Sequence, residues 1–321
     1  MKLAIYSATI PPTAADQPFK LGGIRAFAEG AKRHGVSIIE TDEENYVKSD
    51  VGLMFSFVDL TANKSTLIPY MKTRRRIYLN SNKKLFFFEN DVLKDLNQQG
   101  EAVTQVGRFP FGSVYDDEAE YFLGNIPDER VDTAFQHIQP KQDKKVDKRP
   151  IVLNLNRMSG YGRCGVDQFK WAYKMLEHLY SLNLKTKIRL RVHPGDIKQF
   201  KLKVRRPIDI KYSEKIQQEF PQVILIQPAK GSYLKDVNYA SHNIFSSSSA
   251  SCESIVCGKK TIVTHPSAFA FNYCPNAFLE DKECDANGLL KKYKKTHFTL
   301  DEIRSGVYWD YIKEGLKDLT W

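Results

Sequence analysis

The sequence of 321 residues lacks the features of a membrane-spanning or exported protein. It has no run close to 18 consecutive apolar residues, which is roughly the length that a membrane-spanning helix needs. Its first residues, MKLAIYSATIPP, pass from a short apolar stretch directly into prolines, without the apolar core and small-residue cleavage site of a signal peptide. We therefore expect a cytoplasmic protein that neither spans a membrane nor is secreted by that route.

Cysteine is also scarce, and its spacing fits no metal or disulfide pattern. The five cysteines are odd in number and scattered, with no CxxC pair and no histidine at metal-ligand spacing. This pattern predicts a reduced intracellular protein without a structural metal. The cysteines are Cys164, Cys252, Cys257, Cys274 and Cys284.

The net charge of +10 is confined to one half of the chain. Residues 1–150 have 21 basic and 21 acidic side chains, whereas residues 151–321 have 27 basic and 17 acidic ones. Residues 185–215 alone have 11 Lys or Arg against three acids. Such a concentration favours a polyanionic partner, either a nucleotide diphosphate or a nucleic acid.

Short apolar runs alternate with helical patterns through the first half. Residues 2–7 predict a strand, the pair Gly22 and Gly23 predicts a turn, residues 24–35 have helical spacing, and residues 36–40 predict a second strand. Further apolar runs, interpreted as strands of a parallel sheet buried on both faces, lie at residues 51–58, 75–80 and 84–89.

The charged segment 140–150, with prolines at both ends, is the best candidate for a linker. After it strands and helices alternate again, so the pattern predicts two Rossmann-like, doubly wound α/β domains. We expect domains at 1–139 and 151–298, followed by a C-terminal amphipathic helix at 299–321. In that helix, Trp309 and Trp321 are interpreted as packing residues.

Polar residues that directly follow strands are the most informative, because ligands of doubly wound sheets bind outside the carboxyl ends of the strands. Arg157 follows one predicted strand and precedes small residues that can expose backbone amides to phosphate, although such residues are also ordinary in loops. The sequence RVHPGD, residues 191–196, ends another strand, where His193 could donate a hydrogen bond to an anion or be merely structural.

The sequence SSSSASCE, residues 246–253, lies at a strand-to-helix junction. Its hydroxyls and the free amides of a helix N-terminus would form an anion site, and Glu253 lies in the first turn. Helix capping alone would need only one serine. A fourth polar group, His265-Pro266-Ser267, follows the next strand.

Taken in order, these motifs resemble the donor-binding domain of GT-B glycosyltransferases. RVHPGD together with SSSSASCE and GKKTIVTHPSAFAF is similar to a glycosyltransferase group common in bacteriophages, which is distantly similar to sugar transferases of the Kdo kind. VGLMFSF, LFFFEND, RFPFGSVYDDEAEY and FTLDEIRSGVYW also resemble that group. Two positions depart from it: Val192 stands where proline is more usual, and His265 stands where aspartate is more familiar, which puts a role for His265 in doubt.

The resemblance implies a metal-independent transferase that binds a nucleotide sugar, a UDP-sugar in our interpretation, on its C-terminal domain. Arg157 and His193 would contact the phosphates, Ser248 and Ser249 would donate hydrogen bonds, and Glu253 would bind the ribose hydroxyls. The full set of expected donor-binding residues is Gly22, Gly23, Arg157, Ser159, Gly160, Arg191, His193, Gly195, Ser247, Ser248, Ser249, Ser251 and Glu253. No cofactor other than the donor co-substrate is expected.

An inverting enzyme needs a base for the acceptor hydroxyl, and a retaining one does not. Asp16, after the first strand, and Glu89 or Asp91, at the end of LFFFEND, are the candidates in the N-terminal domain. Exposed loop carboxylates are usually only solvated, and the stereochemistry stays open.

Basic runs interleaved with aromatic residues are typical of nucleic-acid surfaces and equally of solvated faces. The candidate residues are Arg74, Arg75, Arg76, Lys201, Lys203, Arg205 and Arg206.

Our leading hypothesis is transfer of a sugar to a hydroxyl on a modified pyrimidine of double-stranded phage DNA, in the host cytoplasm. The alternatives are transfer to a surface polysaccharide or lipid-linked saccharide, and a non-catalytic nucleotide-binding or nucleic-acid-binding protein on the same fold.

Overall fold

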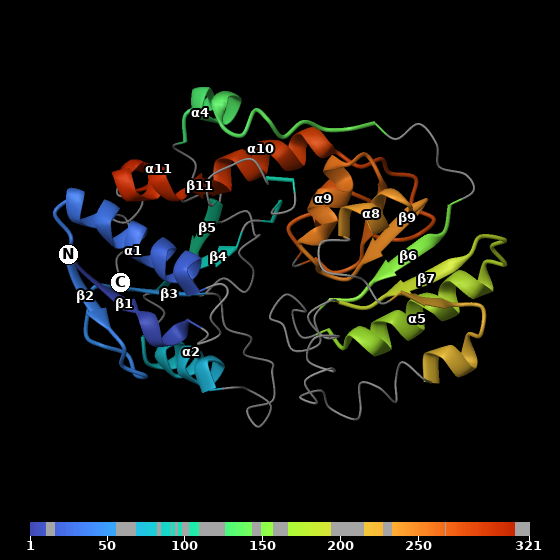
Figure 1. Cartoon of the computed structure of the whole chain (residues 1–321), viewed down its shortest axis with the longest axis horizontal. Coiled ribbons are helices and arrows are strands. Elements are labelled where there is room, and N and C mark those ends of the chain that lie inside the picture. The colour runs from blue at the N-terminus through green and yellow to red at the C-terminus, as the bar shows by residue number, and fades with distance from the viewer. Residues whose placement is uncertain are drawn as a thin grey trace. The chain divides into compact units, whose positions relative to one another are not determined.

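The computed structural model describes residues 1–10, 17–55, 69–81, 85–90, 92–93, 96–97, 103–108, 126–142, 149–156, 166–193, 215–226, 233–266 and 268–311. They form two compact units (Figure 1). Unit 1 comprises residues 1–137 and 291–321, and unit 2 comprises residues 138–290. Within the described ranges, no helix combines the length and apolar character that crossing a membrane requires.

Unit 1 is built on a mixed sheet of six strands in the order β11-β5-β4-β3-β1-β2. The strands β1, β2, β3 and β4 are parallel, while β5 runs antiparallel to both β4 and β11. The first four strands follow the doubly wound order 2-1-3-4. The elements are β1 (Lys2–Tyr6), η1 (Ser7–Thr9), α1 (Gln17–Arg33), β2 (Ser37–Thr41), β3 (Val51–Phe55), α2 (Pro69–Asn80), β4 (Leu85–Asn90), β5 (Val103–Arg108), α4 (Asp128–Thr133), β11 (His297–Thr299) and α11 (Leu300–Ser305).

Unit 2 has a fully parallel sheet of five strands in the order β10-β9-β6-β7-β8. Numbered within the unit, this order is 5-4-1-2-3, the Rossmann arrangement, with its switch point between β6 and β9. The elements are β6 (Ile151–Asn154), α5 (Gln168–Ser181), β7 (Ile188–Arg191), β8 (Ile224–Ile226), α8 (Tyr233–Asn238), β9 (His242–Phe245), α9 (Ala250–Val256), β10 (Lys260–Val263) and η4 (Phe271–Tyr273). Helix α10 (Ala286–Thr296) begins in unit 2 and ends in unit 1. The predicted fold class, two Rossmann-like α/β units, is confirmed.

Two predictions about the strands of unit 1 were wrong. The predicted strand at 75–80 belongs to α2, because Ile77 and Tyr78 pack as one helical face against the sheet residues Ala4, Tyr6 and Met54. The sheet of unit 1 is mixed rather than parallel, because β5 and β11 enter it antiparallel.

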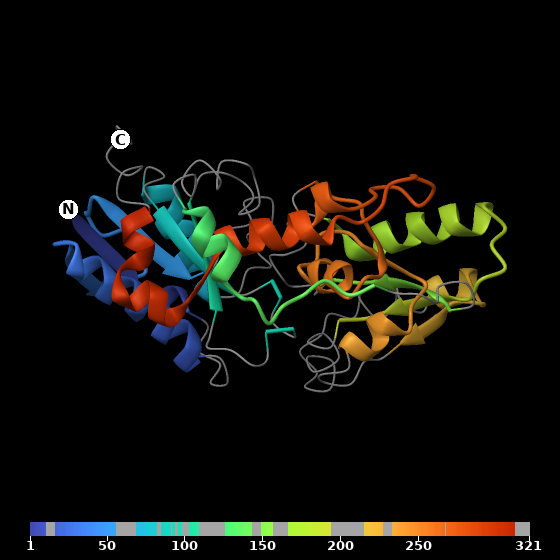
Figure 2. The ribbon, with the colours of Figure 1, turned by 90° about the horizontal axis from the view of Figure 1, so that it is seen from above.

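The predicted turn at Gly22 and Gly23 lies inside α1, which already begins at Gln17. A Cβ atom on Gly22 would meet nothing within 4 Å, so close packing does not require glycine there. Gly30 is the glycine that packing does require. A Cβ atom on it would lie 2.1 Å from the carbonyl oxygen of Ile303, because α11 packs directly on α1 (Figure 2).

The C-terminal region belongs to unit 1 rather than forming a separate helix, and unit 2 ends at residue 290 instead of 298. The helix predicted at 299–321 ends at Ser305, because Gly306 adopts φ +94° as a left-handed C-cap, after which residues 307–311 are helical again. Trp309 is buried and donates a hydrogen bond to the carbonyl of Phe27, so its interpretation as a packing residue is confirmed. Trp321 lies outside the described residues.

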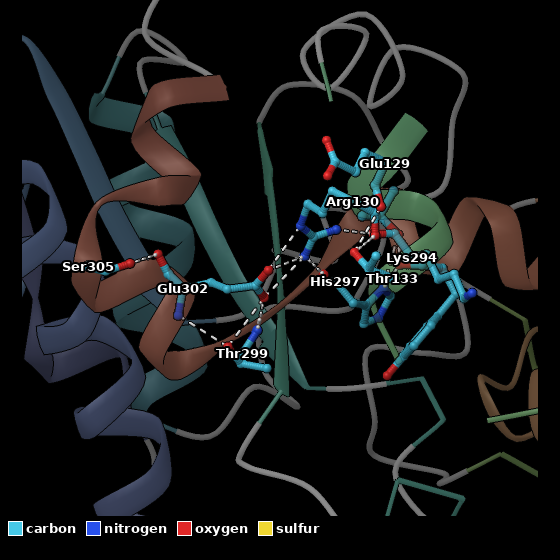
Figure 3. Close-up of polar contacts among 10 residues, drawn as sticks. Glu129, Arg130, Thr133, Lys294, His297, Thr299, Glu302 and Ser305 are labelled. Carbon is cyan, nitrogen blue, oxygen red and sulfur yellow. Dashed lines mark hydrogen bonds and ion pairs between the residues drawn. The ribbon is translucent and has the colours of Figure 1, made fainter. Parts of the chain in front are cut away.

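A buried arginine joins α4 to this C-terminal region (Figure 3). Arg130 forms a bidentate ion pair with Glu302, at 3.0 and 3.1 Å, and donates hydrogen bonds to the carbonyls of Lys294 and His297. Its guanidinium carbon lies 4.0 Å from the centre of the Phe298 ring. Glu302 also completes a capping box with Thr299 at the start of α11. We call these residues the Arg130 cluster. Its hydrogen bonds and ion pair connect β11 and α11 to α4.

The four cysteines in the described part, Cys252, Cys257, Cys274 and Cys284, form no disulfide with one another. Burial raises the pKa of Cys274 to about 12 and also raises the pKa of Cys257 and Cys284. These thiols are therefore protonated and poorly nucleophilic near neutral pH.

Candidate functional site

The parallel strands of unit 2 are followed by four polar residues at the carboxyl edge of the sheet. Asn154 pairs with both Arg191 and Phe245, and Phe245 pairs with Val263. The ladder continues beyond the strands, because Leu155 donates to the carbonyl of Arg191 at 2.9 Å and Thr264 donates to that of Phe245 at 3.1 Å. Two residues beyond the ends of β10, β9, β6 and β7 are His265, Ser247, Asn156 and His193, so these four residues form a row that follows the carboxyl ends of neighbouring strands.

The middle pair of this row lies at the switch point of the sheet. The Asn156 side chain donates a hydrogen bond to the Ser247 hydroxyl at 2.9 Å, across the carboxyl ends of β6 and β9. Ligands of open parallel sheets bind outside this point, where the crossovers diverge to opposite faces. The row therefore lies where a Rossmann unit places its nucleotide.

Gln168, the first residue of α5, holds the two sides of the switch point together. Its side chain is fully buried and accepts a hydrogen bond from the backbone amide of Asn156 at 3.1 Å. The same side chain donates to the Ser246 hydroxyl at 2.9 Å and accepts from it at 3.0 Å. The Trp171 indole, one turn further along α5, donates to the Thr264 hydroxyl at 2.8 Å. The edge is thus held by side chains of α5.

Residues 246–251, which we call the serine turn, use several of their backbone amides in hydrogen bonds within the turn itself. The amide of Ala250 donates to the Ser248 hydroxyl at 3.3 Å, while the amides of Ser251 and Cys252 donate to the carbonyls of Ser248 and Ser249. The expectation of free amides at the start of α9 was wrong, because the turn itself uses these donors. Ser246, Ser247 and Ser251 are buried, Ser248 is half-buried, and Ser249 is exposed.

Arg191 and Glu253 both lie close to the buried ring of Tyr233. Arg191 pairs with Asp236 at 2.9 Å and lies 5.2 Å from the centre of the Tyr233 ring. Burial, reinforced by the negative charge of Glu253, raises the pKa of Tyr233 well above its ordinary value, and its hydroxyl donates to the carbonyl of Ala250. Arg191 and Glu253 are only 5% and 4% exposed, and their contact with a donor stays a prediction.

The two histidines at the ends of the row are both half-buried. Burial lowers the pKa of His265, so its imidazole is neutral at pH 7. A neutral imidazole donates one hydrogen bond and accepts another but carries no charge to offset a phosphate.

Several predicted residues lie outside the described part of the chain. They are Asp16, Asp91, Arg157, Ser159, Gly160, Gly195, Lys201, Lys203, Arg205 and Arg206. For Glu89 the structure describes the backbone, which is in β4 opposite Gln105.

The basic run at 74–76 is not a nucleic-acid surface as a whole. Arg74 is 1% exposed, donates from Nε to the carbonyl of Thr9 at 2.8 Å, and lies 5.0 Å from the centre of the Phe55 ring. Buried against β3, its guanidinium cannot reach DNA, so that prediction is corrected. Arg75 is half-buried, and Arg76 pairs with Glu44 at 3.1 Å.

Sequence reasoning missed Gln168, Tyr233 and Asp236. A signal existed for Gln168, because it is a polar residue at an inward position of an amphipathic helix, directly after the N-cap Asp167. Tyr233 and Asp236 gave no such signal, since their contacts with β7 depend on where α8 packs.

No protein-family model matches the sequence, and no curated protein sequence matches it significantly. Among solved structures, the chain is similar to Thermosulfurimonas dismutans KpsC, beta Kdo 2,4 transferase, with a TM-score of 0.52 and 13% identity over 92% of this chain and 90% of that one. It also matches Thermosulfurimonas dismutans KpsC, beta Kdo 2,7 transferase, with a TM-score of 0.49 and 11% identity over 98% of this chain and 100% of the other. At 13% identity the first likeness, with its TM-score of 0.52, supports the fold alone, a chain of two α/β units.

Proposed function

We propose that this protein is a glycosyltransferase that binds a nucleotide sugar, a UDP-sugar, at the carboxyl edge of unit 2 and transfers the sugar to a hydroxyl without a metal. The observation that supports this most directly is the row of His265, Ser247, Asn156 and His193 across the switch point of a Rossmann sheet. The likeness in fold to a structure named as a Kdo transferase agrees with sugar transfer as the chemistry.

The residues divide between those that would touch the donor and those that would hold them. His193, Ser248 and Ser249 are partly or fully exposed, so we assign them, together with Arg157, to the diphosphate. Ser247 and Asn156 would form the bottom of the site, held by their mutual hydrogen bond. Gln168 would support them by accepting a hydrogen bond from the backbone amide of Asn156. Arg191, Ser251 and Glu253 are buried, and we assign them to positioning the serine turn.

For the leaving group, the protein must offset the charge that develops on the diphosphate as the glycosidic bond breaks. Hydroxyl and imidazole donors fixed before the reaction are effective because they need no reorganisation. Asp16, Glu89 and Asp91 are the proposed bases for an inverting reaction, and none of them is needed if configuration is retained.

Isothermal titration with UDP and single-turnover hydrolysis of UDP-sugars test the donor site. We expect His193→Ala and Ser248→Ala each to weaken UDP binding about tenfold, since each removes one hydrogen bond to a charged group. Ser181→Ala, an exposed serine at the end of α5, is the matched control and should bind as the parent does. Unchanged UDP affinity in both site variants would contradict the assignment. UDP binding without hydrolysis or transfer from any donor would instead indicate a nucleotide-binding protein that is not an enzyme.

For the acceptor we propose a saccharide hydroxyl, as on a surface polysaccharide or lipid-linked saccharide, because the structural neighbour is named for transfer of the sugar Kdo. The second candidate is a hydroxyl on a modified pyrimidine of double-stranded DNA, which the basic excess of residues 185–215 favours. Incubation with one donor and either hydroxymethylated DNA or an oligosaccharide panel separates the two by the mass of the product. Mass gain on DNA only would overturn the saccharide proposal.

A further inference from the structure

The two faces of the sheet in unit 2 differ in chemistry. Side chains of a strand point alternately to opposite faces, and in β6 and β7 the residues Ile151, Leu153, Ile188 and Leu190 join the apolar core with α5. The alternate residues, Val152, Asn154, Arg189 and Arg191, therefore face the opposite side, where α8 lies. Two arginines thus occupy one strand on the α8 face.

Helix α8 lies along β7 so that each arginine stacks on a tyrosine. Arg191 lies over Tyr233, and Arg189 lies over Tyr239, with 4.8 Å from its guanidinium carbon to the ring centre. The two arginines differ in charge balance. Arg191 pairs with Asp236, whereas no carboxylate of the described residues forms an ion pair with Arg189, whose buried Nε has no hydrogen-bond partner among them.

A pocket of about 470 Å³ opens beside Arg189, a volume within the range of small-molecule sites. We call it the α8 pocket. Val152 and Ile226 from the sheet and the half-exposed ring of Tyr239 supply apolar surface, and Lys235 adds a second positive charge. The guanidinium of Arg149 also lies nearby, bonded to the carbonyl of Asn238 at 2.9 Å. The lining residues are Val152, Arg189, Ile226, Lys235, Asp236, Asn238 and Tyr239.

We propose that the α8 pocket binds a small organic anion, a carboxylate or a phosphate monoester, with its charge on Arg189 and Lys235 and its apolar body on Val152, Ile226 and Tyr239. Asp236 does not oppose such a ligand, because Arg191 already neutralises it. The site lies on the face of the sheet and not at its carboxyl edge. The inference is therefore independent of the proposed sugar transfer.

Titration of the full chain, followed by the methyl NMR signals of Val152 and Ile226, tests the proposal. The probes are benzoate and phenyl phosphate, with benzamide as the neutral analogue of benzoate. We expect saturable shifts with at least one anion and none with benzamide at the same concentrations. Shifts with benzoate identify a carboxylate site, and shifts with phenyl phosphate alone identify a phosphate site.

Two variants and a matched control make the test specific. Arg189→Met should weaken anion binding at least about tenfold, as expected for loss of a charged hydrogen-bond donor. Lys235→Gln, which changes an exposed side chain, should weaken binding a few-fold. Lys170→Gln, an exposed lysine on α5, should leave binding unchanged. Equal binding of benzamide, no shift with either anion, or unchanged affinity in both pocket variants would overturn the proposal.

Discussion

Replacing Arg130 by methionine should open the C-terminal region of unit 1 without unfolding unit 2. The change removes a bidentate ion pair with Glu302, two hydrogen bonds to the carbonyls of Lys294 and His297, and the stacking on Phe298. Removing one partner of a buried pair typically costs about 3–5 kcal/mol. Because the Glu302 side chain is 28% exposed and can be hydrated, we expect the lower end, about 3 kcal/mol.

Hydrogen exchange read by mass spectrometry measures this loss locally. At about 1.4 kcal/mol for each factor of ten, exchange of residues 297–305 should accelerate roughly a hundredfold in Arg130→Met, while α5 of unit 2 keeps its protection. The control is Arg304→Gln, an exposed arginine whose pairs with Glu29 and Asp301 should contribute less than about 1 kcal/mol. If exchange in Arg130→Met rises no more than in this control, the Arg130 cluster does not hold the region.

Three further results are expected. Burial lowers the pKa of His297 to about 3. The contribution of neutral His297 to the stability of unit 1 should therefore be complete above about pH 6.5 and fall by about 1.4 kcal/mol per pH unit as pH decreases toward 3. In His297→Gln, the midpoints of urea unfolding should not show this dependence on pH. Within α1, Gly22→Ala should stabilise by about 0.5–1 kcal/mol and Gly30→Ala should destabilise by about 3 kcal/mol, because only the second Cβ meets the backbone of Ile303; equal thermal shifts would contradict this. Gln168→Leu removes a hydrogen-bond partner of the Asn156 backbone amide and of the Ser246 hydroxyl, so it should lower the free energy of unfolding by about 2–3 kcal/mol and weaken UDP binding. A stable variant with full UDP affinity would show that Gln168 does not stabilise the carboxyl edge of the sheet.

The sequence predicted those parts of the fold that depend on short-range patterns. The alternation of apolar runs and helical spacing predicted the doubly wound units. That the polar residues after each strand form a ligand-binding edge of the second sheet stays a prediction. Asn156, His193 and Ser247 follow the carboxyl ends of three neighbouring parallel strands, β6, β7 and β9.

The errors concern features that depend on distant residues. Gly30 is required by the carbonyl of Ile303, and Arg74 is buried by Phe55 and Thr9, so neither role is visible in a local window. Similarly, the antiparallel entry of β11 depends on pairing with β5, nearly 200 residues away in the chain. The stacking of α8 on β7 likewise depends on tertiary packing, which no spacing in the sequence encodes.

The discontinuity of unit 1 has a consequence for synthesis on the ribosome. Unit 2, residues 138–290, has all of its strands before the chain returns to unit 1, whereas β11, α11 and the buried Trp309 come from residues 291–311. During synthesis from the N-terminus, the second unit can therefore fold first. Until residues 291–311 are made, Phe27 lacks its contact with Trp309. For the same reason a fragment that stops at residue 290 should yield a folded second unit attached to an aggregation-prone first one.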